Sequence, residues 1–333
     1  MIAPGTLAAE AAARRRSSLA SGALQPIVAD EERIEDEGVS FVLHRVSGRD
    51  PKRLAAAAGA KGVNPFLPPD PALVVAELSP THLAVLNKFP VLDDHLLLVT
   101  RAYVDQEVLL DAADCAALAL GLAEIDGLAF YNGGRMAGAS QPHKHMQLVR
   151  PPLQGGRRPP RSEPEASEVQ LQGGRRPPRS EPEASEVEAA VDGAGAFAIP
   201  MEARLRGGDA LPFAHAFTAL DPALFERRDA AGPLLLDAYY ALLAAAGLHV
   251  VAGPDGPRAS APYNLLATRR WMFVVPRRAG RFEGLAVNAL GFAGSLFARG
   301  DAEREALVRC GPMNVLRAVA GVAPATGSAK AVG

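Results

Sequence analysis

The chain has 333 residues, of which 48% are hydrophobic and 22% charged, and its formal net charge is −2. This length allows one large domain or two modest ones around a substantial core, and the composition is ordinary for a globular protein. The near-neutral charge excludes a global basic field for nucleic acid, so any phosphate binding must come from local groups. No apolar run approaches the roughly 18–20 residues that span a bilayer, so we expect no membrane partner.

Cysteine usage and the N-terminus indicate the compartment. Cys115 and Cys310 are the only cysteines, too few for a structural zinc site, and we expect both to be reduced, as in a cytoplasm. The alanine-rich stretch from Met1 to Leu24 carries arginines but lacks an apolar segment and includes Glu10. We therefore predict a surface helix leading into the fold rather than a targeting peptide.

The first half of the chain alternates strand-like runs with one helix. Strands are predicted, from residue composition and alternation, at Phe41–Val46, Leu73–Leu78, Leu83–Lys88, His95–Thr100, Leu128–Asn132 and His143–Val149. A helix rich in Ala and Leu is predicted at Asp111–Ile125.

A perfect internal repeat follows. The same 17 letters run from Leu153 to Val169 and again from Leu171 to Val187, with three Arg and three Glu in each copy. The repeat is nearly devoid of apolar residues, so it cannot bury enough surface to offset the entropy of ordering. We predict a duplicated, disordered insertion over residues 153–190. A docking segment or an arginine-rich lid over an anionic substrate is the alternative.

The second half has the same mixture of elements. Strands are predicted at Ala196–Pro200 and Phe213–Leu220, with a hairpin formed by Tyr263–Thr268 and Trp271–Val275. Helices are predicted at Pro233–Ala245 and Ala302–Ala320, and Ala323–Gly333 is expected to be a loose tail. The pattern predicts an α+β fold with a largely antiparallel sheet, in which residues 1–152 and 191–322 form two halves.

The segment from Asn132 to Gln147 carries most of the chemistry. On a strand, His143, His145 and Gln147 would point to one face, just after the glycine-rich turn at Gly133 and Gly134. A histidine with one ring nitrogen deprotonated can attack phosphorus and form a covalent intermediate. His145 is the middle member, so it is the predicted nucleophile. His143, Ser140, Gln147 and the N–H groups near Gly138 could hydrogen-bond the phosphoryl oxygens.

Gln147 favours transfer over hydrolysis. A glutamine donates to phosphate oxygens but does not shuttle the proton of an attacking water. An acceptor that already bears a charged oxygen, such as phosphate, needs no such shuttle. Two milder interpretations of the histidine pair are an exposed strand face and a pair of metal ligands. The local sequence lacks a carboxylate or third imidazole for a metal, so no metal site is predicted.

The run Tyr131-Asn132-Gly133-Gly134 through Gln141-Pro142-His143-Lys144-His145-Met146-Gln147 closely resembles the histidine-triad-like family of ATP adenylyltransferases, also called diadenosine tetraphosphate phosphorylases. The resemblance spans roughly residues 20 to 320, outside the duplicated segment. Similar segments are Asn64–Leu67, Leu86–Pro90, His95–Thr100, Leu211–His215, Tyr263–Leu266, Trp271–Arg277 and Asn288–Gly294. The resemblance implies a histidine-triad-like fold.

The resemblance also implies a reaction and a site. Diadenosine tetraphosphate and phosphate would give ATP and ADP through an adenylylated His145, with a divalent cation such as Mg²⁺ carried by the nucleotide. The α-phosphate and ribose would be held by Asn132, Gly138, Ala139, Ser140, Gln141 and Gln147. Asn87 and Lys88 would line the nucleotide site. Lys52 and the hairpin of Asn264 and Arg269 would reach the distal phosphates. The partners would be nucleotides and phosphate, not nucleic acid.

Several alternatives stay open. A hexose-1-phosphate uridylyltransferase-like enzyme has a related motif, but Lys144 stands where that family has proline and the cysteines for its zinc are missing. A nucleotide hydrolase is disfavoured by Gln147. A non-catalytic nucleotide sensor is a different class. Among other residues, we expect His95 to be structural, His82 has no convincing partner, and Arg277 could face phosphate or solvent.

Overall fold

A computed structural model describes residues 2–46, 64–151, 199–208 and 210–321 of the chain. Lys52, the duplicated segment and the C-terminal tail all lie outside these residues, so the predictions made for them remain predictions.

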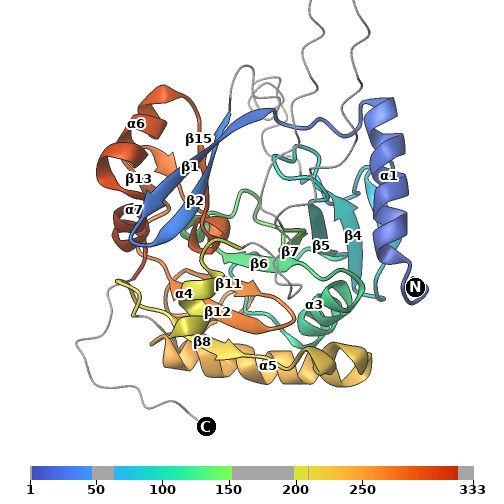
Figure 1. The fold of residues 1–333 in the computed structure, drawn as a ribbon. Coiled ribbons are helices and arrows are strands. Elements are labelled where there is room, and N and C mark those ends of the chain that lie inside the picture. The colour runs from blue at the N-terminus through green and yellow to red at the C-terminus, as the bar shows by residue number, and fades with distance from the viewer. Residues whose placement is uncertain (1, 47–63, 152–198, 209, 322–333) are drawn as a thin grey trace, which may run out of the picture. The chain divides into compact units, whose positions relative to one another are not determined.

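One antiparallel sheet organises the described residues (Figure 1). Its eight strands lie in the order β3-β4-β5-β7-β6-β11-β12-β8, and every neighbouring pair is antiparallel. Their bounds are Val74–Glu77 (β3), His82–Leu86 (β4), Leu96–Thr100 (β5), Leu128–Gly133 (β6), His145–Val149 (β7), Ala216–Ala219 (β8), Tyr263–Ala267 (β11) and Trp271–Pro276 (β12). The pairing of β6 with β11 joins the N-terminal and C-terminal halves into one sheet.

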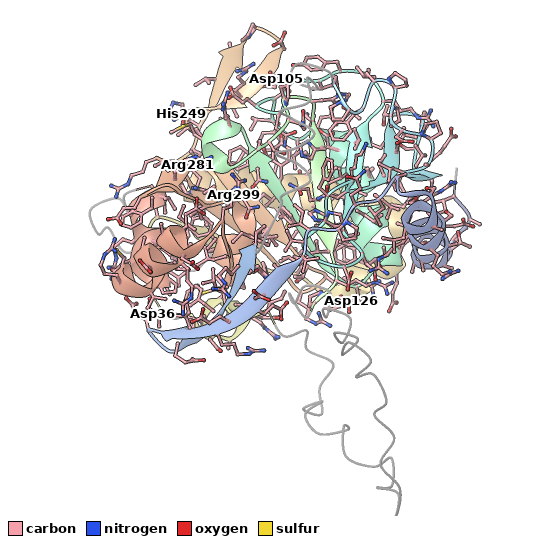
Figure 2. The ribbon with its side chains drawn as sticks, turned by 90° about the horizontal axis from the view of Figure 1, so that it is seen from above. Asp36, Asp105, Asp126, His249, Arg281 and Arg299 are labelled. Atoms are coloured by element: carbon pink, nitrogen blue, oxygen red, sulfur yellow. The ribbon has the colours of Figure 1, made fainter. Side chains whose placement is uncertain are left out.

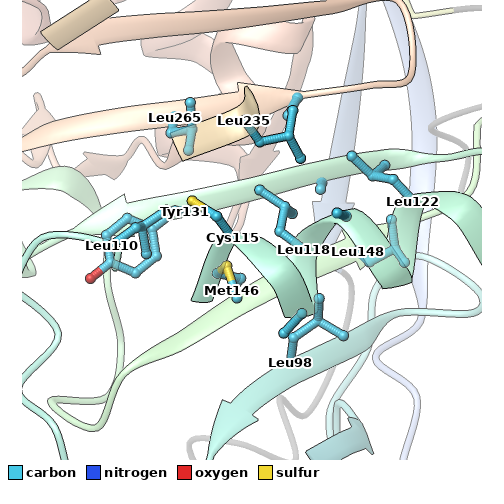
Figure 3. Packing of buried hydrophobic residues seen from close by; sticks show 14 of the residues in the cluster. Leu98, Leu110, Cys115, Leu118, Leu122, Tyr131, Met146, Leu148, Leu235 and Leu265 are labelled. Atoms are coloured by element: carbon cyan, nitrogen blue, oxygen red, sulfur yellow. The ribbon is translucent and has the colours of Figure 1, made fainter. Parts of the chain in front are cut away.

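Two helices cover one face of this sheet. Helix α3 (Ala112–Glu124) lies over β5, β6 and β7, and α5 (Arg228–Ala245) packs against α3, β8 and β12. Figure 3 shows Cys115 and Leu118 of α3 packed among buried side chains that include Met146 and Leu148 of β7. Helix α3 begins at a capping box in which Asp111 accepts from the Asp114 N–H and Asp114 accepts from the Asp111 N–H.

The remaining elements flank the large sheet. A second sheet has the order β1-β2-β15, with bounds Ala29–Asp36, Val39–Val46 and Ser295–Ala298, and β15 runs parallel to β2. Two-stranded pairs form between β9 (Val250–Gly253) and β10 (Gly256–Ala259), and between β13 (Arg281–Phe282) and β14 (Leu285–Ala286). The other helices among the described residues are α1 (Leu7–Ser21), α4 (Glu202–Gly207), α6 (Asp301–Cys310), α7 (Pro312–Val319), η1 (Arg135–Ala137), η2 (Pro222–Glu226) and η3 (Ala289–Ala293).

The α+β class and the antiparallel sheet are confirmed, as are the N-terminal helix and the helices at α3 and α5. The predicted C-terminal helix is wrong in one respect, because Gly311 and Pro312 divide it into α6 and α7. Gly311 has φ +82°, which ends a helix readily. Strand β1 was missed because its sequence, Ala-Asp-Glu-Glu-Arg-Ile-Glu-Asp, is mostly charged and lies on a sheet edge.

The predicted strand at Ala196–Pro200 lies only partly within the described residues. The part of Ala196–Pro200 that is described forms no strand and leads into α4. None of the helices in the described ranges combines the length and apolar character that crossing a bilayer requires.

Candidate active site

Strand register brings four of the predicted site residues to one face of the sheet, namely His145, Gln147, Asn132 and Asn264. On β7, Met146 and Leu148 point into the core beneath α3, so His145 and Gln147 point to the opposite face. Asn132 on β6 and Asn264 on β11 are direct partners in the ladder. Neither asparagine is part of the α3 core cluster, whereas their strand neighbours Tyr131 and Tyr263 are.

The His145 imidazole is held in one tautomer. Its Nδ1 lies 2.8 Å from the backbone carbonyl of His143, so Nδ1 carries the proton and donates it to that oxygen. Nε2 then carries the lone pair, which is the form that attacks an electrophile. The ring is 4% exposed and lies 5.4 Å from the ring of Phe66, measured between centroids. The strand therefore supplies a buried, oriented imidazole whose unprotonated nitrogen can act as a nucleophile.

His143 has a different role from the one predicted. The regular strand begins at His145, and both ring nitrogens of His143 bond to protein groups. Nε2 donates to the Thr100 carbonyl at 2.8 Å, and Nδ1 accepts from Asn64 Nδ2 at 2.9 Å. Burial lowers the pKa of His143, which favours the neutral ring that these contacts require. In this structure the side chain anchors the Asn64 segment instead of pointing a donor at a phosphoryl group.

Gln147 is oriented by a chain of side chains from the neighbouring strand. Asn87 Nδ2 donates to His95 Nδ1 at 3.1 Å, and His95 Nε2 donates to Gln147 Oε1 at 2.9 Å. The amide oxygen of Gln147 is thereby occupied, so its NH₂ group is turned to the other side, where it can donate. His95 is thus more than a strand anchor. Local sequence could not reveal this, because His95 lies 52 residues from Gln147.

Asn132 is fixed by the C-terminal half. Its Oδ1 accepts from Asn264 Nδ2 at 2.8 Å and from the Ala289 N–H at 3.0 Å, which leaves its NH₂ group facing away from both donors. Asn264 Oδ1 in turn accepts from Arg277. Asn132 is therefore presented with its donor side oriented by groups from two other elements.

Arg277 is buried beside Asn264 and the loop after β6, and it does not face solvent. It is 2% exposed, and its guanidinium donates to Asn264 and to the backbone carbonyls of Ala137, Ala279, Val287 and Val319. Burial lowers the pKa of Arg277 to about 9. No carboxylate among the described residues forms an ion pair with it. It ties the loop after β6 to β12 and to the start of η3.

The glycine loop after β6 is closed by its own amides. The N–H groups of Gly138 and Ala139 donate to the carbonyls of Arg135 and Gly134 at 3.0 and 3.2 Å. These amides are therefore engaged within the turn, and the predicted phosphate contacts of Gly138 and Ala139 would need the loop to rearrange. Gly138 has φ +99°, and a Cβ there would lie 2.8 Å from the Asn288 Cα, so glycine permits close approach of two chain segments.

Lys144 lies behind the strand, in a buried ionic group. Its Nζ is 2.8 Å from Asp114 Oδ2 and 2.9 Å from the Leu109 carbonyl. Asp114 Oδ1 accepts from His82 Nε2 at 3.0 Å, so His82 has a partner that the sequence did not reveal. Burial raises the pKa of Asp114, but the His82 hydrogen bond and the Lys144 charge outweigh it and hold this pKa below its usual value. This group fixes the residue between the two histidines to the start of α3.

The remaining predicted site residues divide into three groups. Ser140, which is exposed, and Gln141, which is half-buried, follow the glycine loop, and Lys88 is an exposed cation beside Asn87. Lys52 is outside the described residues. Arg269 lies away from the site, which contradicts its prediction.

Arg269 belongs to the far end of the sheet. Its Nε and Nη2 donate to the carbonyls of Leu122 and Ala123 at 2.7 Å, so it caps the C-terminal turn of α3. It also lies 4.0 Å from Asp126. Figure 2 shows Asp126 well apart from Asp105, the residue that bridges to His143. The strand β11 runs from Asn264 away to Ala267, roughly 10 Å, and Arg269 lies beyond its end against α3, which removes Arg269 from the site.

Metal ligands do not gather in the described residues. No group of three or more His, Cys, Asp or Glu side chains is arranged there to hold an ion.

Two family models match the chain, one in each half. The Ap4A phosphorylase N-terminal domain matches residues 1–161, and the ATP adenylyltransferase C-terminal domain matches residues 209–322. Together they cover most of the chain. The chain belongs to the Ap4A phosphorylase and ATP adenylyltransferase family. The resemblance expected from the sequence is thus confirmed.

Relatives and solved structures of this phosphorylase family agree. Diadenosine 5',5'''-P1,P4-tetraphosphate phosphorylase 2 of Saccharomyces cerevisiae is 27% identical over 259 residues, which are 72% of this chain and 70% of the relative. Protein APA1 of the same yeast is 37% identical over 75 residues, or 20% of this chain and 23% of the relative. The structure of yeast Ap4A phosphorylase Apa2 with AMP matches with a TM-score of 0.68 and 21% identity, covering 98% of this chain and all of the other. The complex with Ap4A gives 0.63, 20% identity and the same coverage. These structures share the phosphorylase fold.

Proposed function

We propose that this protein phosphorolyses diadenosine tetraphosphate to ATP and ADP, reversibly, through an adenylyl group on His145. The observation that carries the proposal is the His145 Nδ1 bond to the His143 carbonyl, which leaves the Nε2 lone pair as the nucleophile. The placement of Gln147 and Asn132 on the same face supports it. The similarity to the yeast phosphorylase supports the choice of substrate.

The chemistry consists of two displacements at one phosphorus. His145 Nε2 attacks the α-phosphorus of the dinucleotide, an N–P bond forms, and the P–O bond to the departing ATP breaks. A phosphate oxygen then attacks the adenylyl phosphorus, the N–P bond breaks, and ADP leaves with the new P–O bond. Neither step requires proton removal from the acceptor, because phosphate already bears an anionic oxygen.

Side chains would stabilise the charge that develops on the non-bridging oxygens. The NH₂ groups of Gln147 and Asn132 are donors oriented in advance by their neighbours, and such preorganised donors stabilise a transition state without reorganisation. Lys88 would neutralise part of the polyphosphate. We further propose that Mg²⁺ arrives with the nucleotide, and that the enzyme works in the cytoplasm, in keeping with its free cysteines.

The test follows ATP and ADP from diadenosine tetraphosphate with and without phosphate. We expect the two nucleotides in equal amounts, dependent on phosphate, and a protein mass increase of one AMP that maps to His145. His145→Ala should abolish turnover and labelling while AMP still binds. His249→Ala, at an exposed histidine, is the matched control.

Three outcomes would contradict the proposal. Labelling at His143 would refute the choice of nucleophile. AMP as the main product would refute the preference for phosphate over water. Tight nucleotide binding with no turnover by the wild-type chain would favour a nucleotide sensor.

A further inference from the structure

The ladder between β6 and β7 stops just before the active site. Its pairs are Leu128 with Val149, Ala129 with Leu148, and Phe130 with Gln147. Continued in the same register, the next two pairs would place Asn132 directly opposite His145. That pairing is not made. The two strands separate at the point where one carries the nucleophile and the other carries the donor amide.

The side chain of Gln106 takes the place of the missing rung. The His145 N–H donates to Gln106 Oε1 at 2.8 Å, and Gln106 Nε2 donates to the His145 carbonyl at 3.1 Å. The same Nε2 donates to the Asn132 carbonyl at 3.0 Å. One side-chain amide therefore satisfies both backbone groups of His145 and one of Asn132, as a neighbouring strand would.

Gln106 is itself held firmly. Its side chain is 2% exposed, its N–H donates to the Pro142 carbonyl at 2.7 Å, and its carbonyl accepts from the Tyr131 hydroxyl. The preceding residues continue the pairing of the histidine segment, since Asp105 bridges to His143 and the Lys144 N–H donates to the Val104 carbonyl at 2.8 Å. The backbone of Gln106 is thus fixed, and its side-chain amide lies in the gap between β6 and β7.

We propose that Gln106 is a positioning residue that holds β6 and β7 apart and thereby sets the spacing between His145 and Asn132. If the strands closed into a direct pair, the two Cβ atoms would lie about 4.5–5.5 Å apart. That spacing leaves little room between the side chains for a phosphoryl group. The inserted amide opens the gap without leaving buried backbone groups unsatisfied.

The chemistry of the gap specifies an amide. The site presents one donor, the His145 N–H, and two acceptors, the carbonyls of His145 and Asn132. Glutamine matches them with one oxygen and two N–H bonds. A glutamate would match the donor only, and its ionised form would face two carbonyl oxygens. Protonation would restore one donor, and burial would raise the pKa at which this occurs.

The experiment compares Gln106→Glu with the wild type, and uses Gln25→Glu, at an exposed glutamine, as the control. This readout rests on the proposed phosphorolysis. We expect Gln106→Glu to lower kcat at least 100-fold at pH 8 and to recover at least tenfold relative to the wild type at pH 6. The Kd for AMP should change less than threefold. Gln25→Glu should match the wild type at both pH values.

Loss of AMP binding in parallel with kcat would overturn the proposal, because Gln106 would then only maintain the fold of the pocket. Retention of kcat within threefold at pH 8 would overturn it as well. A crystal structure of Gln106→Ala tests the spacing independently of any activity. We expect Asn132 and His145 to pair directly in that variant. Unchanged positions of β6 and β7 would refute the proposal that Gln106 holds the two strands apart. If the wild type is inactive on diadenosine tetraphosphate, the proposed function fails and this structure still decides the inference.

Discussion

Asn264 Nδ2 donates to Asn132 Oδ1 at 2.8 Å across the junction of β6 and β11. The two residues are direct partners in the ladder, although 132 positions separate them in the chain. The bond joins the two halves of the protein at the site itself. Because Asn132 is expected to donate to the phosphoryl group, the C-terminal half controls the orientation of a donor supplied by the N-terminal half.

Replacing Asn264 with aspartate should separate activity from stability. The carboxylate keeps an acceptor for Arg277 and gains an ion pair, but it cannot donate to Asn132 Oδ1 or to the Ala137 carbonyl. We expect kcat/KM for phosphorolysis to fall by about 10- to 100-fold, equivalent to roughly 1.4–2.8 kcal/mol. The urea midpoint should change little. A variant with full activity would show that the Asn132 amide needs no orientation by Asn264.

The His95 contact predicts an effect on turnover rather than on binding. His95→Leu removes the donor that occupies Gln147 Oε1, so the Gln147 amide can rotate. Loss of an oriented donor should lower kcat by roughly tenfold or more, with KM changed by less than threefold. Steady-state kinetics check this against His249→Leu, an exposed histidine labelled in Figure 2. A rise in KM at constant kcat would instead assign His95 to substrate binding.

Arg269 provides the opposite case. Arg269→Gln should leave KM for diadenosine tetraphosphate unchanged, because the guanidinium bonds to the carbonyls of Leu122 and Ala123. Loss of these two bonds should lower the free energy of unfolding by about 1–3 kcal/mol. Urea unfolding and steady-state kinetics measure the two effects. An increase in KM without loss of stability would return Arg269 to the phosphate site.

His143 makes folding stability dependent on pH. Burial lowers its folded-state pKa below the ordinary value of 6.5, so the unfolded chain takes up the proton first as pH falls. Protons therefore favour unfolding from about pH 6.5 downward, and stability is lost until the folded-state pKa is passed. Urea unfolding from pH 8 to 5 should show a smaller loss for His143→Gln than for the wild type. Parallel curves for the two proteins would refute this source of pH dependence.

Much of the site could be predicted from local sequence. The two-residue period of a strand is a local property, and it predicted His143, His145 and Gln147 on one face. The structure places His145 and Gln147 on that face, whereas His143 precedes the strand. The strand-like runs likewise predicted most of the sheet that joins both halves, and the run rich in Ala and Leu predicted α3. These local patterns predicted the nucleophile and the amide beside it, and they determined the α+β class.

Long-range pairing decided the rest. The orientation of Gln147 depends on His95, that of Asn132 depends on Asn264, and the gap between their strands depends on Gln106. These contacts form only when strands and loops far apart in the chain become neighbours. The local sequence around either residue does not reveal its hydrogen-bond partner. Arg269 shows the same limit, because the turn between β11 and β12 places its side chain against the end of α3. The sequence thus determined which groups can react, and the tertiary structure decided which groups hold them in place.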